Sequence, residues 1–79
     1  MSPAEILEVL QTGSPEVTWI VDGDGYHNVV EGVGEVFAGL NAVKRQQYVY
    51  GLLNPYIADG RLHAVSIRTF TPAEKAAAE

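Results

Sequence analysis

Residues 43–72, VKRQQYVYGLLNPYIADGRLHAVSIRTFTP, join a helical pattern to a strand pattern and place one histidine, His63, between them. The chain leaves the helix through Asp59-Gly60-Arg61 and then enters an alternation of apolar and polar residues. Such an alternation with β-branched residues is typical of a strand that buries one face. We therefore predict a strand over residues 62–70, with His63 on the same face as Val65 and at the rim of the core.

The helical part of this stretch contains two residues that interrupt helices, Gly51 and Pro55. Asn41 is a suitable N-cap for the helix that follows it. Proline lacks the backbone donor and clashes with the preceding turn. We predict a short helix, a kink and a second short helix that ends near Ala58. This connection favours a crossover, so the strand that follows should lie parallel to an earlier one.

Two capping-box sequences mark helix starts near the two ends of the chain. Residues 2–5, SPAE, predict a helix over residues 3–12. Residues 71–74, TPAE, predict a second helix, which is short because few residues remain after them.

Two strand patterns lie between the first helix and the middle of the chain. β-Branched and aromatic residues favour strands over residues 16–22 and 26–33, and a glycine-rich turn at residues 22–25 joins them into an antiparallel hairpin. The predicted order is helix, strand, strand, helix, helix, strand, helix (α-β-β-α-α-β-α). This order indicates an α+β fold with a three-stranded mixed sheet covered by helices.

Composition limits the kinds of function open to the chain. Its 79 residues make one small domain, residues 1–79, with room for a single core and a shallow site. With no cysteine, it has no disulfide, no thiolate nucleophile and no iron–sulfur site of its own. The net charge of −5 opposes general attraction to nucleic acid. Without a long apolar run or a signal peptide, we expect a cytoplasmic protein with no membrane segment.

Several segments, in a consistent order and spacing, resemble the BolA-like family, in the branch represented by IbaG. These segments are GDGYH (residues 23–27), GEVFAG (34–39), RQQYVYG (45–51), YIAD (56–59), RLHAVSI (61–67) and TPAE (71–74). The resemblance covers nearly the whole chain from Val17 and implies a type II KH-like fold with the element order predicted above. Asn28 and Glu31 depart from the aromatic and apolar residues of the family pattern, so we expect the second strand to be an edge.

The resemblance also implies a role in iron–sulfur chemistry. In BolA-like proteins the histidine at the position of His63 is implicated as a ligand of a [2Fe–2S] cluster held jointly with a monothiol glutaredoxin, where the glutaredoxin and glutathione supply thiolates. His27 matches a histidine common in this branch and is the candidate second ligand. Asp24 is a weaker candidate, because carboxylate is a hard ligand. The residues alone are also compatible with a structural His63 at the start of a strand, hydrogen-bonded to a neighbouring carbonyl, and with an ordinary exposed strand histidine at His27.

On this interpretation the chain alone holds no cofactor, and the free protein is a monomer or a weak homodimer. The alternative function is a nucleic-acid-binding transcriptional regulator, because the middle helix of the family has been proposed to bind DNA. Lys44, Arg45 and Arg68 are the candidate contacts, although the GXXG loop of KH domains is absent. We do not expect an enzyme, because the sequence has no Gly-x-Ser-x-Gly elbow and no phosphate-binding loop.

Overall fold

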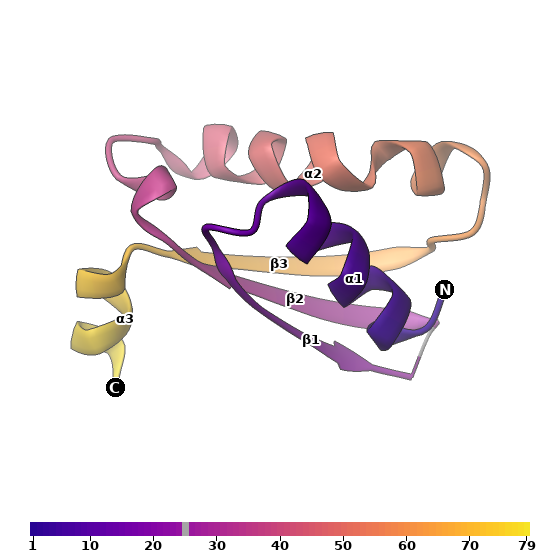
Figure 1. The fold of residues 1–79 in the computed structure, drawn as a ribbon, viewed down its shortest axis with the longest axis horizontal. Coiled ribbons are helices and arrows are strands. Elements are labelled where there is room, and N and C mark those ends of the chain that lie inside the picture. Colours follow the sequence, from indigo (N-terminus) through magenta and orange to yellow (C-terminus); the bar gives the residue numbers. More distant parts are fainter. Residues whose placement is uncertain (25) are drawn as a thin grey trace.

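The computed structural model describes residues 1–24 and 26–79, and its centre is a three-stranded sheet (Figure 1). The elements are α1 (Pro3–Gly13), β1 (Thr18–Gly23), β2 (His27–Val33), the 3-10 helix η1 (Glu35–Phe37), α2 (Ala42–Ala58), β3 (Ala64–Phe70) and α3 (Pro72–Ala78). α1 and α2 lie on the same face of the sheet, and α3 lies at the end where β3 finishes (Figure 1). The predicted α+β class is confirmed. The turn predicted at residues 22–25 includes Gly25, which lies outside the described residues.

The strand order in the sheet is β1-β2-β3. β1 pairs antiparallel with β2, as the hairpin predicts, and β2 pairs parallel with β3 across the long connection. The expectation that the second strand is an edge is wrong, because β2 has a partner on each side. Glu31 is accommodated there by a hydrogen bond from Lys75 Nζ at 3.1 Å. Asn28 is fully buried, and its side-chain N and O have no hydrogen-bond partner among the described residues.

The core lies between the sheet and the two long helices. Trp19 of β1 is 5% exposed, and its Nε1 donates a 3.0 Å hydrogen bond to the carbonyl of Ser14. The ring of Phe37 meets Trp19 edge to face, with centroids 6.5 Å apart. The other buried apolar residues are Ile6, Leu10, Val17, Val30, Val49, Leu53 and Leu62. The buried residues come from α1, β1, β2, η1, α2 and the segments that precede β1 and β3, so one core joins the hairpin, the helices and the crossover.

α2 is one continuous helix of 17 residues, and the predicted kink between two short helices is wrong. Pro55 lies in its last turn, where the missing donor removes a single hydrogen bond near the helix end. Val49 and Leu53 are fully buried against the sheet, whereas Gly51 faces open space. Burial of the inner face therefore outweighs the local preferences of Gly51 and Pro55.

The predicted helix starts are confirmed. Ser2 and Thr71 each accept a hydrogen bond from the backbone of the glutamate three residues later, and that glutamate bonds back to the cap. Asn41 Oδ1 accepts from Lys44 N at 2.9 Å, as an N-cap does. None of the helices in the described ranges has the length and apolar character needed to cross a membrane.

The strand that follows α2 begins at Ala64, two residues later than predicted. Gly60 adopts a positive φ of 83° after the helix, and Leu62 N donates to the carbonyl of Tyr56 at 3.0 Å. This turn places Leu62, only 2% exposed, in the core. His63 is exposed and precedes the strand, so it is not part of the strand that was predicted to begin at residue 62.

Candidate functional site

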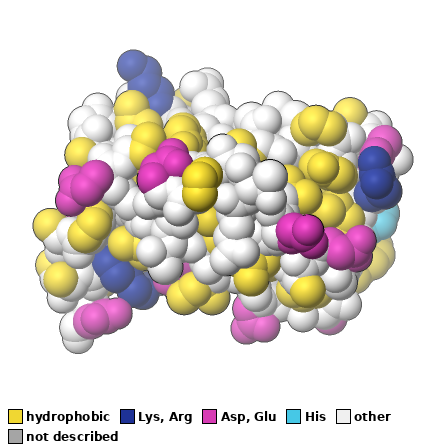
Figure 2. All heavy atoms as spheres, in the orientation of Figure 1, with side chains coloured by type: hydrophobic (Ala, Val, Ile, Leu, Met, Phe, Trp, Pro, Cys, Tyr) yellow, Lys and Arg dark blue, Asp and Glu magenta, His cyan; other side chains and the backbone are white. Residues whose placement is uncertain are grey.

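The two histidines lie at the same corner of the sheet. β2 begins at His27, and the Cα partner of His27 in β3 is Ala64, the residue directly after His63. Because β2 and β3 are parallel, their starting ends meet at one edge of the sheet. Figure 2 shows histidine atoms at one extreme end of the molecule. The fold therefore brings together two residues that are 36 positions apart in the sequence.

The ring of His63 stacks on the ring of Tyr26. The ring centroids are 5.3 Å apart and the planes differ by 29°. Both side chains are exposed, and Tyr26 is 71% exposed. Stacking limits the rotation of the imidazole while its nitrogens remain open to solvent or to a partner. The sequence did not indicate Tyr26 as a site residue, because its contact with His63 joins two segments that are far apart in the chain.

The ring of His27 lies on the sheet face opposite the long helices. In β2 the exposed residues His27 and Val29 alternate with the buried residues Asn28 and Val30, which point toward the helices. His27 Nε2 is 3.4 Å from Ser66 Oγ in β3, which makes a weak hydrogen bond at most. His27 is therefore held loosely and remains accessible.

Asp24 organises the loop that precedes His27. Its Oδ1 accepts hydrogen bonds from the backbone N–H groups of His27 at 2.8 Å and Tyr26 at 2.9 Å. These two hydrogen bonds hold the pKa of the Asp24 carboxyl below its usual value, and the bond from His27 has the larger effect. The geometry supports Asp24 as a residue that positions its neighbours. Within residues 1–24 and 26–79, no three His, Asp or Glu side chains are grouped to hold a metal ion.

The loop between α2 and β3 has a second carboxylate with a local partner. Asp59 Oδ2 lies 2.8 Å from Nε of Arg61, and Asp59 Oδ1 accepts from the backbone N of Arg61 at 3.0 Å. The guanidinium bond and the backbone bond lower the pKa of Asp59. The ring of Tyr56 lies beneath the guanidinium, 5.1 Å from its carbon. The guanidinium of Arg61 is therefore bound by neighbouring residues of its own segment, next in sequence to the exposed imidazole of His63.

The three basic residues predicted to contact nucleic acid do not share one kind of environment. Lys44 is exposed on the first turn of α2. The guanidinium of Arg45 donates to both oxygens of Glu74, at 2.7 and 3.3 Å, and its side chain is 15% exposed. Arg68 belongs to β3, with its guanidinium 5.6 Å from the ring centre of Phe70. Of this set, Arg45 is already neutralised within the fold.

Comparison with known proteins gives a consistent assignment. The family described as "BolA-like protein" matches residues 6–74. Acid stress protein IbaG of Escherichia coli (strain K12) is 51% identical over 74 residues, which cover 94% of this chain and 88% of that protein. A BolA protein homologue from Coxiella burnetii superposes with a TM-score of 0.85 at 30% identity, over 96% of this chain and 97% of the other. BolA1 from Arabidopsis thaliana gives 0.76 at 34% identity, over 91% and 93% of the two chains.

Proposed function

The chain belongs to the BolA-like family, and we propose that it is an accessory protein that pairs with a monothiol glutaredoxin and shares a [2Fe–2S] cluster with it. One observation supports this function above the others. Two exposed imidazoles, those of His27 and His63, lie at the adjoining starts of two parallel strands. A site of this kind can offer ligands to a group that a second protein presents.

The chemistry of the available ligands also favours a shared cluster. Neutral imidazole is a good ligand for iron in iron–sulfur clusters, as in centres where two histidines replace two cysteines. This chain has no cysteine, so the glutaredoxin and glutathione would supply the thiolates. Replacing thiolate by imidazole raises the reduction potential of a cluster. A cluster with such ligands suits a role in iron–sulfur trafficking or iron sensing.

His63 is the proposed principal ligand and His27 the second. Stacking against Tyr26 orients the His63 ring without covering it. His27 has only the long contact to Ser66, which a stronger metal bond would replace. Asp24 is the weakest candidate, because its Oδ1 already accepts two backbone hydrogen bonds and carboxylate suits harder metal ions.

The test is anaerobic reconstitution with a monothiol glutaredoxin, glutathione, iron and sulfide, followed by visible absorption and circular dichroism. The wild-type protein should give a spectrum that differs from that of the glutaredoxin homodimer. His63→Ala should lose this spectrum, and His27→Ala should weaken or alter it. Lys44→Glu is the control, because it changes an exposed charge outside the proposed site. If wild-type protein leaves the glutaredoxin spectrum unchanged, the proposal is wrong.

Nucleic acid binding is the alternative function, with Lys44, Arg45 and Arg68 as contacts. The exposed Lys44 at the start of α2 is the observation in its favour. The ion pair of Arg45 with Glu74 and the net charge of −5 oppose it. Titration of duplex DNA at several salt concentrations separates the two functions. DNA binding that disappears in Lys44→Glu and persists in His63→Ala would favour the alternative.

A further inference from the structure

β3 forms one outer edge of the sheet, because the strand order is β1-β2-β3. Proteins commonly protect such an edge with a proline, a bulge or a covering element. β3 contains no proline, and its pairing with β2 runs without a bulge through residues 64–70. α3, which follows β3, is directed back toward β2, where Lys75 bonds Glu31. β3 therefore presents a regular edge of seven residues.

The backbone groups of β3 point alternately toward β2 and toward the free edge. The carbonyl of Phe70 accepts a hydrogen bond from Gly34 N at 2.9 Å, on the β2 side. Because the direction alternates along the strand, Val65, Ile67 and Thr69 direct their N–H and C=O groups to the free edge. Within residues 1–24 and 26–79, these groups have no hydrogen-bond partner. Another extended strand offers donors and acceptors at the same spacing.

The other edge strand, β1, is less suited to such pairing. Gly23 N donates to Oδ1 of Asp22 at 2.8 Å, so a side chain already binds one amide at the end of this strand. Asp22 also adds a carboxylate to β1, in a chain whose net charge is −5. β3 contains no acidic residue, and its one charged residue is Arg68. Two copies of this acidic chain can therefore meet along β3 without bringing strand carboxylates together.

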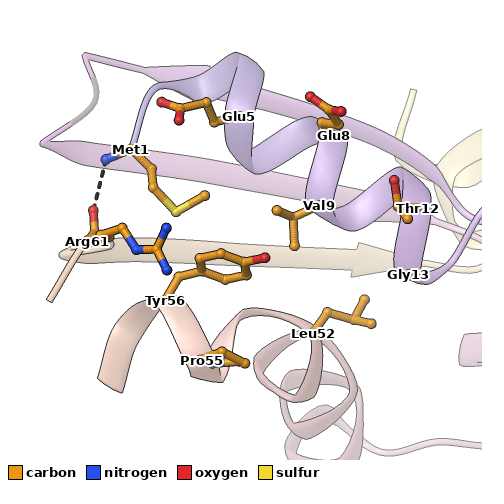
Figure 3. Close-up of a pocket in the computed structure, with 10 residues that line it drawn as sticks. All are labelled: Met1, Glu5, Glu8, Val9, Thr12, Gly13, Leu52, Pro55, Tyr56 and Arg61. Atoms are coloured by element: carbon orange, nitrogen blue, oxygen red, sulfur yellow. Dashed lines mark hydrogen bonds between the residues drawn. The ribbon is translucent and has the colours of Figure 1, made fainter. Parts of the chain in front are cut away.

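The two flanks of α2 also differ in charge. The flank toward α1 borders a groove with charges of both signs, from Glu5, Glu8 and Arg61 (Figure 3). Leu52 lines this groove, and Tyr50, two positions away, lies on nearly the opposite side of the helix. The residues that line a shallow hollow on that opposite side are Ala42, Val43, Gln46, Gln47 and Tyr50, none of them charged. α1 contacts β1 and α2 contacts β3, so this uncharged flank lies on the side of the β3 edge.

We propose that β3 pairs antiparallel with β3 of a second copy of this chain, about a twofold axis at Ile67, the middle residue of the strand. Ile67 of each copy then exchanges both backbone hydrogen bonds with Ile67 of the other, and Val65 exchanges both with Thr69. This register gives a partner to every backbone group that β3 directs to its free edge. Ser66 of one copy lies opposite Arg68 of the other, so the two arginines do not face each other.

The pairing also covers apolar side chains. Val65 and Ile67 are half-buried although they pack against the core, so part of each remains open at the edge. Val43 is 64% exposed on the uncharged flank of α2, beside the half-buried Tyr50. In the dimer the two copies of this flank approach each other across the axis and lose contact with water, which favours association. None of these residues is a proposed cluster ligand, so the dimer and the cluster function can fail separately.

Two measurements on the unmodified chain test the dimer. Sedimentation equilibrium from micromolar to millimolar protein should show a reversible monomer–dimer equilibrium. Amide hydrogen exchange followed by NMR should show that protection of Val65, Ile67 and Thr69 rises with protein concentration, because these N–H groups become bonded only in the dimer. A monomer at every concentration overturns the proposal. So does protection of these amides that requires added glutaredoxin, because the edge then belongs to that partner.

Charge variants at Ser66 test the register. Ser66→Arg places arginine opposite Arg68 of the other copy in two symmetric pairs and should weaken the dimer about fivefold, whereas Ser66→Glu should strengthen it by a similar factor. Net charge alone predicts the reverse, because Ser66→Arg makes the chain less negative. Thr18→Arg and Thr18→Glu are the controls at an exposed position of β1 and should leave the dimer unchanged. Effects at Ser66 that follow net charge, or equal effects at Thr18, overturn the proposed register, and circular dichroism checks the fold of each variant.

Discussion

The two ends of the sheet differ in the reach of their side-chain ion pairs. At the end near α3, Arg45 bonds Glu74 across 29 positions of sequence, and Lys75 bonds Glu31 across 44. At the histidine end the ion pair is local, between Asp59 and Arg61, and the long-range polar contacts there, Met1 N to the carbonyl of Arg61 and His27 to Ser66, are not ion pairs between side chains. Long-range pairs hold separate elements together, whereas local bonds only shape a loop. The α3 end thus contributes to holding the fold, and the histidine end keeps its imidazoles available.

Core packing shows the same asymmetry. At the histidine end Asn28, the neighbour of His27, is fully buried with both polar atoms of its side chain unpaired among the described residues. Such a group costs stability. At the α3 end the half-buried Glu31 of the same strand has a partner in Lys75. One strand therefore contains a satisfied polar residue near one end and an unsatisfied one near the other.

The largest effect on stability is expected when the α3 end is disrupted. Arg45→Ala should lower the free energy of unfolding by about 1 to 2 kcal/mol, because the carbonyl of Leu40 loses a charged donor at 2.9 Å. Urea unfolding measures this change. Lys44→Ala is the control, since its exposed side chain should contribute less than about 0.5 kcal/mol. Equal losses of unfolding free energy in the two variants would contradict the structural role given to Arg45.

The same Arg45→Ala variant should change the response to acid. Arg45 and the backbone N–H of Thr71 lower the pKa of Glu74 from 4.5 to about 2. Because the folded-state pKa is the lower one, Glu74 stabilises the fold fully above pH 4.5, and this contribution disappears as the pH falls toward 2. Without Arg45, the pKa of Glu74 moves back toward 4.5, so the loss of stability across this range should be smaller. A steeper loss in the variant would contradict this account.

A smaller effect of opposite sign is expected beside the histidines. Asn28→Leu should raise the free energy of unfolding by about 1 kcal/mol, because an apolar group of similar size replaces a buried, unpaired amide. Asn54→Leu is the matched control at an exposed position of α2. Thermal and urea unfolding measure both variants. A loss of stability in Asn28→Leu would indicate that the amide has a partner in solution.

The smallest effect is expected at the histidines themselves. His63→Ala and His27→Ala should each change the free energy of unfolding by less than about 0.5 kcal/mol, because both side chains are exposed. Nearly unchanged urea curves would show that a loss of the mixed cluster spectrum is not caused by unfolding. A large loss of stability in either variant would place the histidines among the residues that hold the fold.

The elements could be predicted where local chemistry is strong. The two capping boxes and the β-branched runs of the hairpin appear in the structure with small shifts of their ends. The prediction of a kink at Gly51 and Pro55 was wrong. The local preferences of these two residues are outweighed by the burial of Val49 and Leu53, which keeps the helix continuous. The edge position expected for β2 was wrong for a related reason. A strand's neighbours depend on the whole chain and not on its own polar residues.

By itself, the sequence determined the fold class, the helix starts, the lack of thiols and the identity of the two histidines. Only the tertiary structure decided that His27 and His63 lie at the same corner of the sheet and that Tyr26 stacks on His63. It also decided that Glu74 forms an ion pair with Arg45. Caps and alternations depend on residues a few positions apart, so they can be identified in the sequence. Contacts across 29 or more positions depend on strand register and crossover, which the chain acquires only when its core forms.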